Sequence, residues 1–289
     1  MEKKELYEKI YSKIDELPTL PAVVPKLLSL VEKEESTASD LTEAISCDPA
    51  LTSKILKVAN SAYYGFSQQI SQVEHAVALL GFNMVKSLAL SIGVIQTFPS
   101  GERSPRFSVE GLWLHSLSVA TLIEELGRRF GKKNPDGSIF VVGLLHDIGK
   151  VVLHQFFGDL FKQVLDEANN QEGMNLHIAE QKIIGIDHCE VGGMLLTRWK
   201  FPDYIINPIA FHHQYEVSEE INPVDVGMLR IANIVAQELG LGKEGNSVVN
   251  EVHESDIELL KMNNNDFNNM KKYSHDIKDE IQDLFNAMT

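Results

Sequence analysis

The sequence predicts an all-α fold made of two packed helical lobes. Apolar residues recur three and four positions apart along most of the chain, and the alternation typical of strands is nearly absent. The 289 residues, 44% hydrophobic and 23% charged, suit one large domain or two modest ones. A loop-forming segment at 99–105 separates the lobes, which we place at about 1–98 and 106–239. Residues 240–289 are predicted to add a C-terminal helical extension.

Prolines, glycines and capping residues divide the N-terminal lobe into helices. The segment LPTLP at 17–21 ends the first helix, Asp48-Pro49 separates two others, and Gly81 is the hinge between the last pair. Residues 60–65 are expected to form a loop. The predicted helices cover residues 2–16, a stretch that starts near 25, and then 41–47, 51–58, 73–80 and 84–98.

The C-terminal lobe continues the helical pattern after position 106. His115 lies on the buried face of its helix, because it recurs with apolar residues at helical spacing, and Asn233 lies on an apolar face for the same reason. A turn at 131–137 and a loop at 169–173 separate some of the helices. The predicted helices cover 112–126, 156–168, a stretch that starts near 188, 202–213 and 226–236, with a central apolar segment at 140–153.

The charge and cysteine content exclude some classes of protein. A net charge of −15 and a pI near 5.1 argue against duplex DNA as a partner, because binding a phosphate backbone requires clustered Lys and Arg. Cys47 and Cys189 lie far apart in no metal-binding spacing, which fits a reducing cytoplasm. We find no signal peptide, and no uninterrupted apolar stretch approaches ~18 residues. We therefore expect a cytoplasmic protein with no membrane contact.

The most informative stretch is GLLHDIGK at residues 143–150. It places His146, Asp147 and Lys150 inside an apolar segment. Burying an imidazole and a carboxylate together is costly unless a partner compensates them. A divalent metal ion is one such partner, and a hydrogen-bonded His–Asp pair at a helix start is the alternative.

Other histidines support the metal interpretation. A single histidine on an apolar face is more often a satisfied core group than a ligand, but several on successive helices favour a metal site. Mixed imidazole and carboxylate ligands favour iron, manganese, zinc or nickel over magnesium or calcium. The histidines that could converge with Asp147 are His115, His146, His188, His212 and His213. The other five are expected to be structural or surface groups: His75, His154, His177, His253 and His275.

The order of these residues resembles the HD superfamily of metal-dependent phosphohydrolases, whose pattern H…HD…D holds one or two metals that activate a water. Lys150, His188 and the pair His212-His213 are similar to the HD-GYP branch, which hydrolyses cyclic di-nucleotides. The metal-ligand set implied by this resemblance is His115, His146, Asp147, His188, His212, His213 and Asn233.

The N-terminal half narrows the resemblance. The segments LPTLP at 17–21, DPAL at 48–51, NSAYY at 60–64 and LLG at 79–81 together resemble the HDOD domain, the HD-related output domain of bacterial signalling proteins. The resemblance covers residues 17–239. It implies a regulatory module, because HDOD proteins resemble degenerate HD folds without established catalysis.

The sequence departs from the catalytic pattern at three places. The last position, normally Asp in catalytic members, is Asn233. The glutamate that HD-GYP enzymes carry one helical turn before the first histidine falls at Gly111, and QYEV at 214–217 stands where Gly-Tyr-Pro is expected. The metal-ligand set is therefore only partly retained.

These observations support three hypotheses for function. The first is a bacterial signalling module with a degenerate metal site and no catalysis. The second is a phosphohydrolase or cyclic di-nucleotide phosphodiesterase, with Asp147 and Lys150 as candidate catalytic residues. The third is a nucleotide sensor. We expect a signalling protein as partner, because we identify no receiver or nucleotide-cyclase segment in the chain, and a nucleotide is the candidate small ligand.

Overall fold

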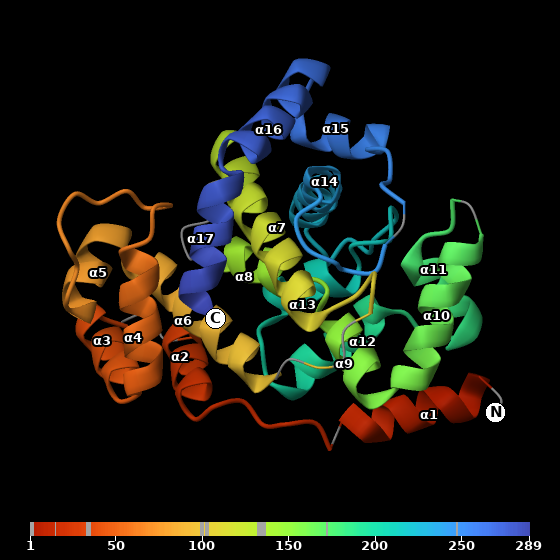
Figure 1. Ribbon diagram of the computed structural model, residues 1–289, viewed down its shortest axis with the longest axis horizontal. Helices are drawn as coiled ribbons and strands as arrows, with labels where there is room; N and C mark the ends of the chain where they lie inside the picture. The colour runs from red at the N-terminus through yellow and green to blue at the C-terminus, as the bar shows by residue number, and fades with distance from the viewer. Residues whose placement is uncertain are drawn as a thin grey trace.

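The computed structural model describes residues 3–14, 16–32, 36–98, 101, 104–131, 137–171, 173–246 and 248–289. Four residues of the predicted loop 99–105 and most of the predicted turn 131–137 lie outside them. Within these ranges the chain forms helices joined by turns, and the one β pairing is an isolated bridge between Phe107 and Glu244. The prediction of an all-α fold is therefore confirmed (Figure 1).

Helices α2 to α6 lie together at one end of the molecule (Figure 1). Local chemistry starts and ends them: Thr37 and Asp40 form a capping box before α3, and the Asp48 side chain accepts two backbone N–H groups at the start of α4. Gly81, with φ of 88°, makes the sharp corner between α5 and α6. The helices are α2 (Val23–Glu32), α3 (Ala38–Ser46), α4 (Pro49–Ala59), α5 (Val73–Leu80) and α6 (Phe82–Thr97).

The second group of helices is built around α7 (Val109–Arg129), which packs against both α8 and α14. The helix that we expected at 156–168 starts slightly later, because Phe156 ends α9 and Gly158 opens α10. The remaining helices are α8 (Ser138–Leu145), α9 (Ile148–Phe156), α10 (Gly158–Asn170), α11 (Leu176–Ile183), α12 (His188–Arg198), α13 (Asp203–Ala210) and α14 (Pro223–Leu239).

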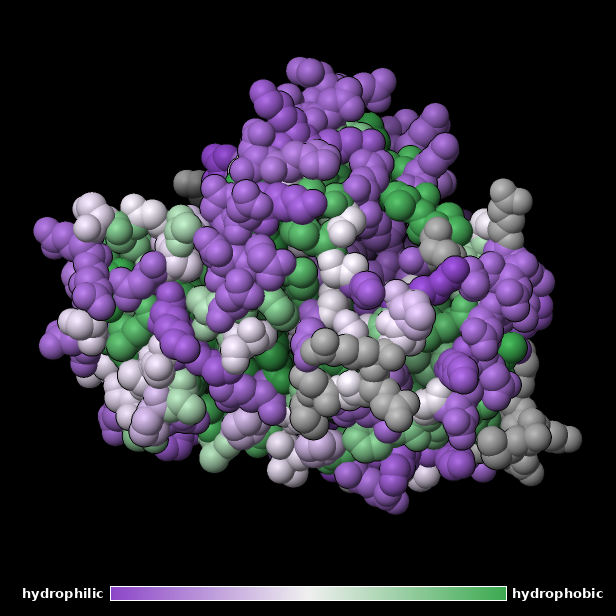
Figure 2. All heavy atoms as spheres, viewed as in Figure 1, coloured by the Kyte–Doolittle hydropathy of each residue, from purple (hydrophilic) through white to green (hydrophobic). Residues whose placement is uncertain are grey.

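The two ends of the chain each cross to the opposite group of helices. Helix α1 (Lys3–Ile14) packs against α12, and α17 (Lys278–Met288) packs against α4 and α7. Lys54 Nζ donates to the carbonyl oxygen of Thr289 at 2.7 Å. Helices α15 (Glu254–Leu260) and α16 (Asn264–Asp276) complete the C-terminal region, and Figure 2 shows that hydrophilic side chains dominate the face seen there.

The segment Ser138–Phe156 has the length and hydropathy of a membrane span, as does the pair Val73–Leu80 and Phe82–Thr97 taken together. The first segment is interrupted by the turn at His146 and Asp147, and 83% of its apolar window is buried inside the protein. The second pair bends by 120°. Both are therefore explained as core helices of a folded lobe.

Candidate metal centre

The central His-Asp pair lies in the turn between α8 and α9, at the heart of the second helical group. Gly149 allows α12 to approach this turn, because a Cβ atom there would lie 2.0 Å from the carbonyl oxygen of His188. Any larger residue would push α9 and α12 apart. The close contact places Asp147 directly beside His188.

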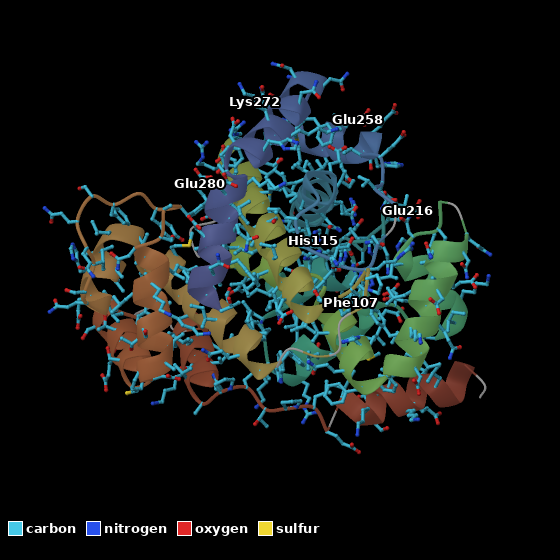
Figure 3. All side chains as sticks on the ribbon, viewed as in Figure 1. Phe107, His115, Glu216, Glu258, Lys272 and Glu280 are labelled. Carbon is cyan, nitrogen blue, oxygen red and sulfur yellow. The ribbon has the colours of Figure 1, made fainter. Side chains whose placement is uncertain are left out.

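One oxygen of Asp147 faces the first group of histidines. Asp147 Oδ2 lies 3.2 Å from His146 Nε2 and 4.0 Å from His115 Nε2, which comes from α7. His115 Nε2 donates to Asn233 Oδ1 of α14 at 2.9 Å. We call His115, His146, Asn233 and Asp147 Oδ2 the first half of the centre; Figure 3 shows His115 in the interior of the helical group.

The other oxygen of Asp147 faces a second group of histidines. Asp147 Oδ1 lies 3.2 Å from His188 Nε2 and 3.9 Å from His212 Nε2. His213 Nε2 lies 3.2 Å from His188 Nε2. We call these three histidines and Asp147 Oδ1 the second half. The structure thus brings together all seven residues of the predicted ligand set.

Three of the imidazoles are held by hydrogen bonds at the nitrogen that points away from Asp147. His146 Nδ1 and His212 Nδ1 donate to the carbonyl oxygens of Gly143 and Ile209, each at 2.8 Å. His188 Nδ1 donates to Glu180 at 2.6 Å. Such bonds fix the tautomer and leave Nε2 available to a metal ion, which is the usual arrangement around protein-bound metals.

Two buried atoms of the centre fit a metal ion. His146 Nε2 and Asp147 Oδ1 have no hydrogen-bond partner among the described residues, although an unpaired buried polar atom costs ~1–3 kcal/mol. Two sets of side chains have ligand atoms within 4.8 Å of one another: His115, His146 and Asp147, and separately His188, Cys189, His212 and His213. Imidazole and carboxylate donors at these positions could hold a divalent transition metal.

A buried lysine also occupies the first half. Lys150 Nζ lies 2.7 Å from Asp147 Oδ2 and 2.6 Å from Glu244 Oε2, and its side chain is 1% exposed. Burial acts to raise the pKa of Asp147, but the effect of His146 and Lys150 is larger and opposite. The pKa of Asp147 is therefore well below its ordinary value, and the carboxylate stays ionised. Burial acts to lower the pKa of Lys150, and Asp147 and Glu244 more than reverse this effect. The lysine is therefore an ammonium held between two carboxylates.

His188 differs in its pKa from the other histidines described here. Burial lowers the pKa of His115 to about 4 and holds the pKa values of His212 and His213 well below their ordinary value. Burial also acts to lower the pKa of His188, but the Glu180 carboxylate raises it well above the ordinary value. Burial raises the pKa of Cys189 to about 12, so its thiol is protonated in the absence of a metal ion.

Four neighbours of the centre were missed in the sequence. Glu180 orients His188, Glu244 pairs with Lys150, Cys189 contacts His212, and the ring of His177 stacks on that of His213 with 4.0 Å between centroids. The helical spacing of Glu180 with Leu176 and Ala179, both buried, was a usable signal. Glu244 follows Gly240 and Gly242 in a segment whose composition indicates only a loop.

Comparison with known proteins identifies the family. The sequence model of the HDOD domain matches residues 17–215. The chain belongs to the HDOD family. An uncharacterised protein of Treponema pallidum is 26% identical over 231 residues, which are 80% of this chain but 44% of that protein. The part of that relative that this HDOD chain matches is therefore less than half of its length.

Two solved structures share the fold. An HDOD domain protein of unknown function from Geobacter sulfurreducens is 27% identical with a TM-score of 0.75, and the match covers 98% of this chain and 96% of that one. A Marinobacter aquaeolei protein, provisionally described as a signal transduction protein, is 20% identical with a TM-score of 0.83 over 99% of this chain and 65% of its own. At this identity the second likeness concerns the fold alone.

Proposed function

We propose that this HDOD protein is a regulatory module of bacterial signal transduction that binds one divalent transition-metal ion and has no phosphohydrolase activity. In this proposal the ion is iron, manganese, zinc or nickel, and the module acts in the cytoplasm on a signalling protein partner. Membership of the HDOD family supports the regulatory part. The geometry of the two halves supports the rest.

The observation that carries the proposal is the occupation of the first half by protein groups. Lys150 Nζ already places a positive charge on Asp147 Oδ2, and Glu244 balances it. His115 Nε2 lies 2.9 Å from the acceptor Asn233 Oδ1, and the tautomer that makes this hydrogen bond has no lone pair on Nε2 for a metal. Asn233 adds no negative charge. A second cation beside the Lys150 ammonium would be repelled in this buried site.

The second half would hold the ion through His188, His212, His213 and Asp147 Oδ1. These groups approach one another from α9, α12 and the end of α13, and Asp147 Oδ1 has no hydrogen-bond partner within the described ranges. When bound, the ion would supply a fixed positive charge that joins these elements. Metal binding would in this way stabilise the folded form of the module.

The same contacts argue against catalysis. The hypothesis of a phosphohydrolase gives Lys150 the task of steadying a substrate phosphate, but its ammonium is buried between two carboxylates. Gly111 has no side chain where HD-GYP enzymes carry a glutamate, and the backbone of Lys243 lies against it. The centre therefore lacks both a lysine available to a substrate phosphate and the glutamate that HD-GYP enzymes carry.

Metal analysis and a turnover assay test the proposal together. Protein purified without a histidine tag is expected to contain about one transition-metal ion per chain by plasma mass spectrometry. Incubation with cyclic di-nucleotides is expected to give no multiple turnover. Sustained hydrolysis that disappears in His146→Ala would instead establish the phosphodiesterase.

A further inference from the structure

A cavity of about 420 Å³ adjoins the first half of the centre. His115 and Glu244 reach it from the centre, while Arg106 and, from the segment 240–249, residues 240–243, 246, 248 and 249 supply much of its wall. This volume lies within the range of small-molecule sites, ~300–1,000 Å³. The metal-site residues of the second half are not among those that line it. The cavity is therefore a separate compartment next to the candidate metal centre.

The shape of the cavity depends on a close contact between two glycines. A Cβ atom on Gly242 would lie 2.0 Å from the carbonyl oxygen of Gly111, and one on Gly111 would lie 2.6 Å from the backbone nitrogen of Lys243. The Ser108 N–H donates to the Lys243 carbonyl oxygen at 3.2 Å. The segment therefore lies directly on the start of α7, with Lys243 exposed and Glu244 buried.

The lining combines three kinds of chemistry. Arg106 and Lys243, both exposed, place two cations at the cavity. Leu241, Val248 and Val249 supply apolar surface. The third kind is a polar side chain: Gln237 lines the cavity, and its buried Oε1 has no hydrogen-bond partner in the part of the chain that the structure describes. A complementary ligand carries an anion, an apolar body and a hydrogen-bond donor.

We propose that this cavity binds a small organic phosphate, of the size and chemistry of a nucleoside monophosphate, and that the bound ligand acts on the metal centre through Glu244. A phosphate monoester matches two cations at one cavity, one of them an arginine, better than a single carboxylate does. A nucleobase offers both a flat apolar surface for the valines and an N–H donor for Gln237.

A chain of contacts leads from the cavity to the centre. Gln237 Nε2 lies 3.4 Å from Glu244 Oε1, Glu244 Oε2 lies 2.6 Å from Lys150 Nζ, and Lys150 Nζ lies 2.7 Å from Asp147 Oδ2. A ligand that engages Gln237 therefore touches the first residue of this chain of contacts. A ligand that engages Lys243 touches the residue that precedes Glu244 in the sequence. Only this coupling rests on the proposed metal site; binding of the phosphate does not require the metal.

Calorimetric titration of the full chain with three probes tests the binding. AMP carries both the phosphate and the base, adenosine lacks the anion, and inorganic phosphate lacks the body. We expect AMP to bind at least about tenfold more tightly than either fragment, because both ends contribute. No heat with AMP, or AMP binding no tighter than phosphate, would overturn the proposal.

Two variants locate the bound probe. Arg106→Glu combined with Lys243→Glu is expected to weaken AMP binding about tenfold or more through lost charge pairing. The matched control is Lys272→Glu with Lys278→Glu, the same charge change at exposed positions; Figure 3 shows Lys272 on α16, away from His115. Gln237→Leu should weaken AMP but leave phosphate unchanged. Equal affinities in the two double variants would place AMP elsewhere and refute the site.

The same titrations separate this proposal from that for the metal. Protein from which a chelator has removed the metal should bind AMP as tightly as untreated protein. The AMP affinities of the three variants should keep the same order. AMP should also shift the metal affinity of wild type by a factor that Glu244→Gln reduces toward one. AMP binding in a protein that takes up no metal would refute the proposed metal function and leave the pocket standing.

Discussion

The two halves of the centre share one carboxylate but neutralise it differently. On the side of His115, a lysine ammonium lies on Asp147 Oδ2, and an amide takes the place of a second carboxylate. On the side of His188, Asp147 Oδ1 lies 3.2 Å from His188 Nε2 and 3.9 Å from His212 Nε2, so its neighbours are imidazoles and not a lysine ammonium. A buried carboxylate needs a cation or hydrogen-bond donors to offset the loss of its hydration. Lys150 thus pairs with one oxygen of Asp147, and in our proposal the metal ion binds the other.

The largest effect is expected from removing the shared charge with Asp147→Asn. Lys150 would then keep Glu244 alone, and both halves would lose their anion. Breaking a buried charge pair typically costs ~3–5 kcal/mol, so the melting temperature should fall steeply and metal should be lost. The exposed Asp276→Asn is the control. A melting temperature equal to that of wild type would contradict the charge balance described for the first half.

A half-buried carboxylate elsewhere, Glu124, shows what happens without such compensation. Burial first, and the neighbouring Glu125 second, raise the pKa of Glu124 on α7 to about 7 from its ordinary 4.5. The folded state therefore holds this proton more tightly than the unfolded state. Its contribution is complete below pH 4.5 and is lost as the pH rises through 7.

Unfolding experiments with Glu124→Gln measure this contribution. Wild type should lose on the order of 2–3 kcal/mol relative to the variant between about pH 5 and about pH 8. Glu219→Gln, at an exposed position, should leave the pH dependence of wild type in place. Parallel pH profiles for wild type and Glu124→Gln would show that burial does not perturb this group.

The variant Asn233→Asp tests whether the missing negative charge explains the difference between the two halves. The new carboxylate faces His115 Nε2 and would restore the negative charge that the first half lacks. We expect metal affinity there to rise roughly tenfold, after the desolvation of the carboxylate is subtracted from its attraction for the ion. Metal content should rise toward two ions per chain. A lower melting temperature that manganese or zinc does not restore would mean that Asn233 is only a core amide.

Much of the centre follows from helical spacing. A histidine on an apolar helix face must find a partner, so the sequence identifies His115 and the HD pair as converging groups. Spacing does not reveal partners that arrive from distant segments. Glu244 lies 94 residues after Lys150, in a glycine-containing loop whose path depends on Gly111. The assignment of His177 as structural or surface likewise missed its stacking on His213.

In the fold, too, local features follow from the sequence but contacts between distant segments do not. Proline, glycine and capping residues determine where most helices begin and end, and the structure follows them at Asp48 and Gly81. The amphipathic pattern of α1 indicates a buried face but not its neighbour, which is α12 of the other group of helices. Tertiary contacts of this kind depend on the whole core and have no local signal.

The most direct test of the account is the metal content of two matched variants. His188→Ala removes an imidazole of the second half, and His115→Ala removes one from the half that Lys150 occupies. Metal bound to tag-free protein is measured by plasma mass spectrometry after equilibration with manganese or zinc. The account predicts about one ion per chain in wild type and in His115→Ala, and at least about a tenfold loss of affinity in His188→Ala. Loss of the ion in His115→Ala with retention in His188→Ala would contradict it.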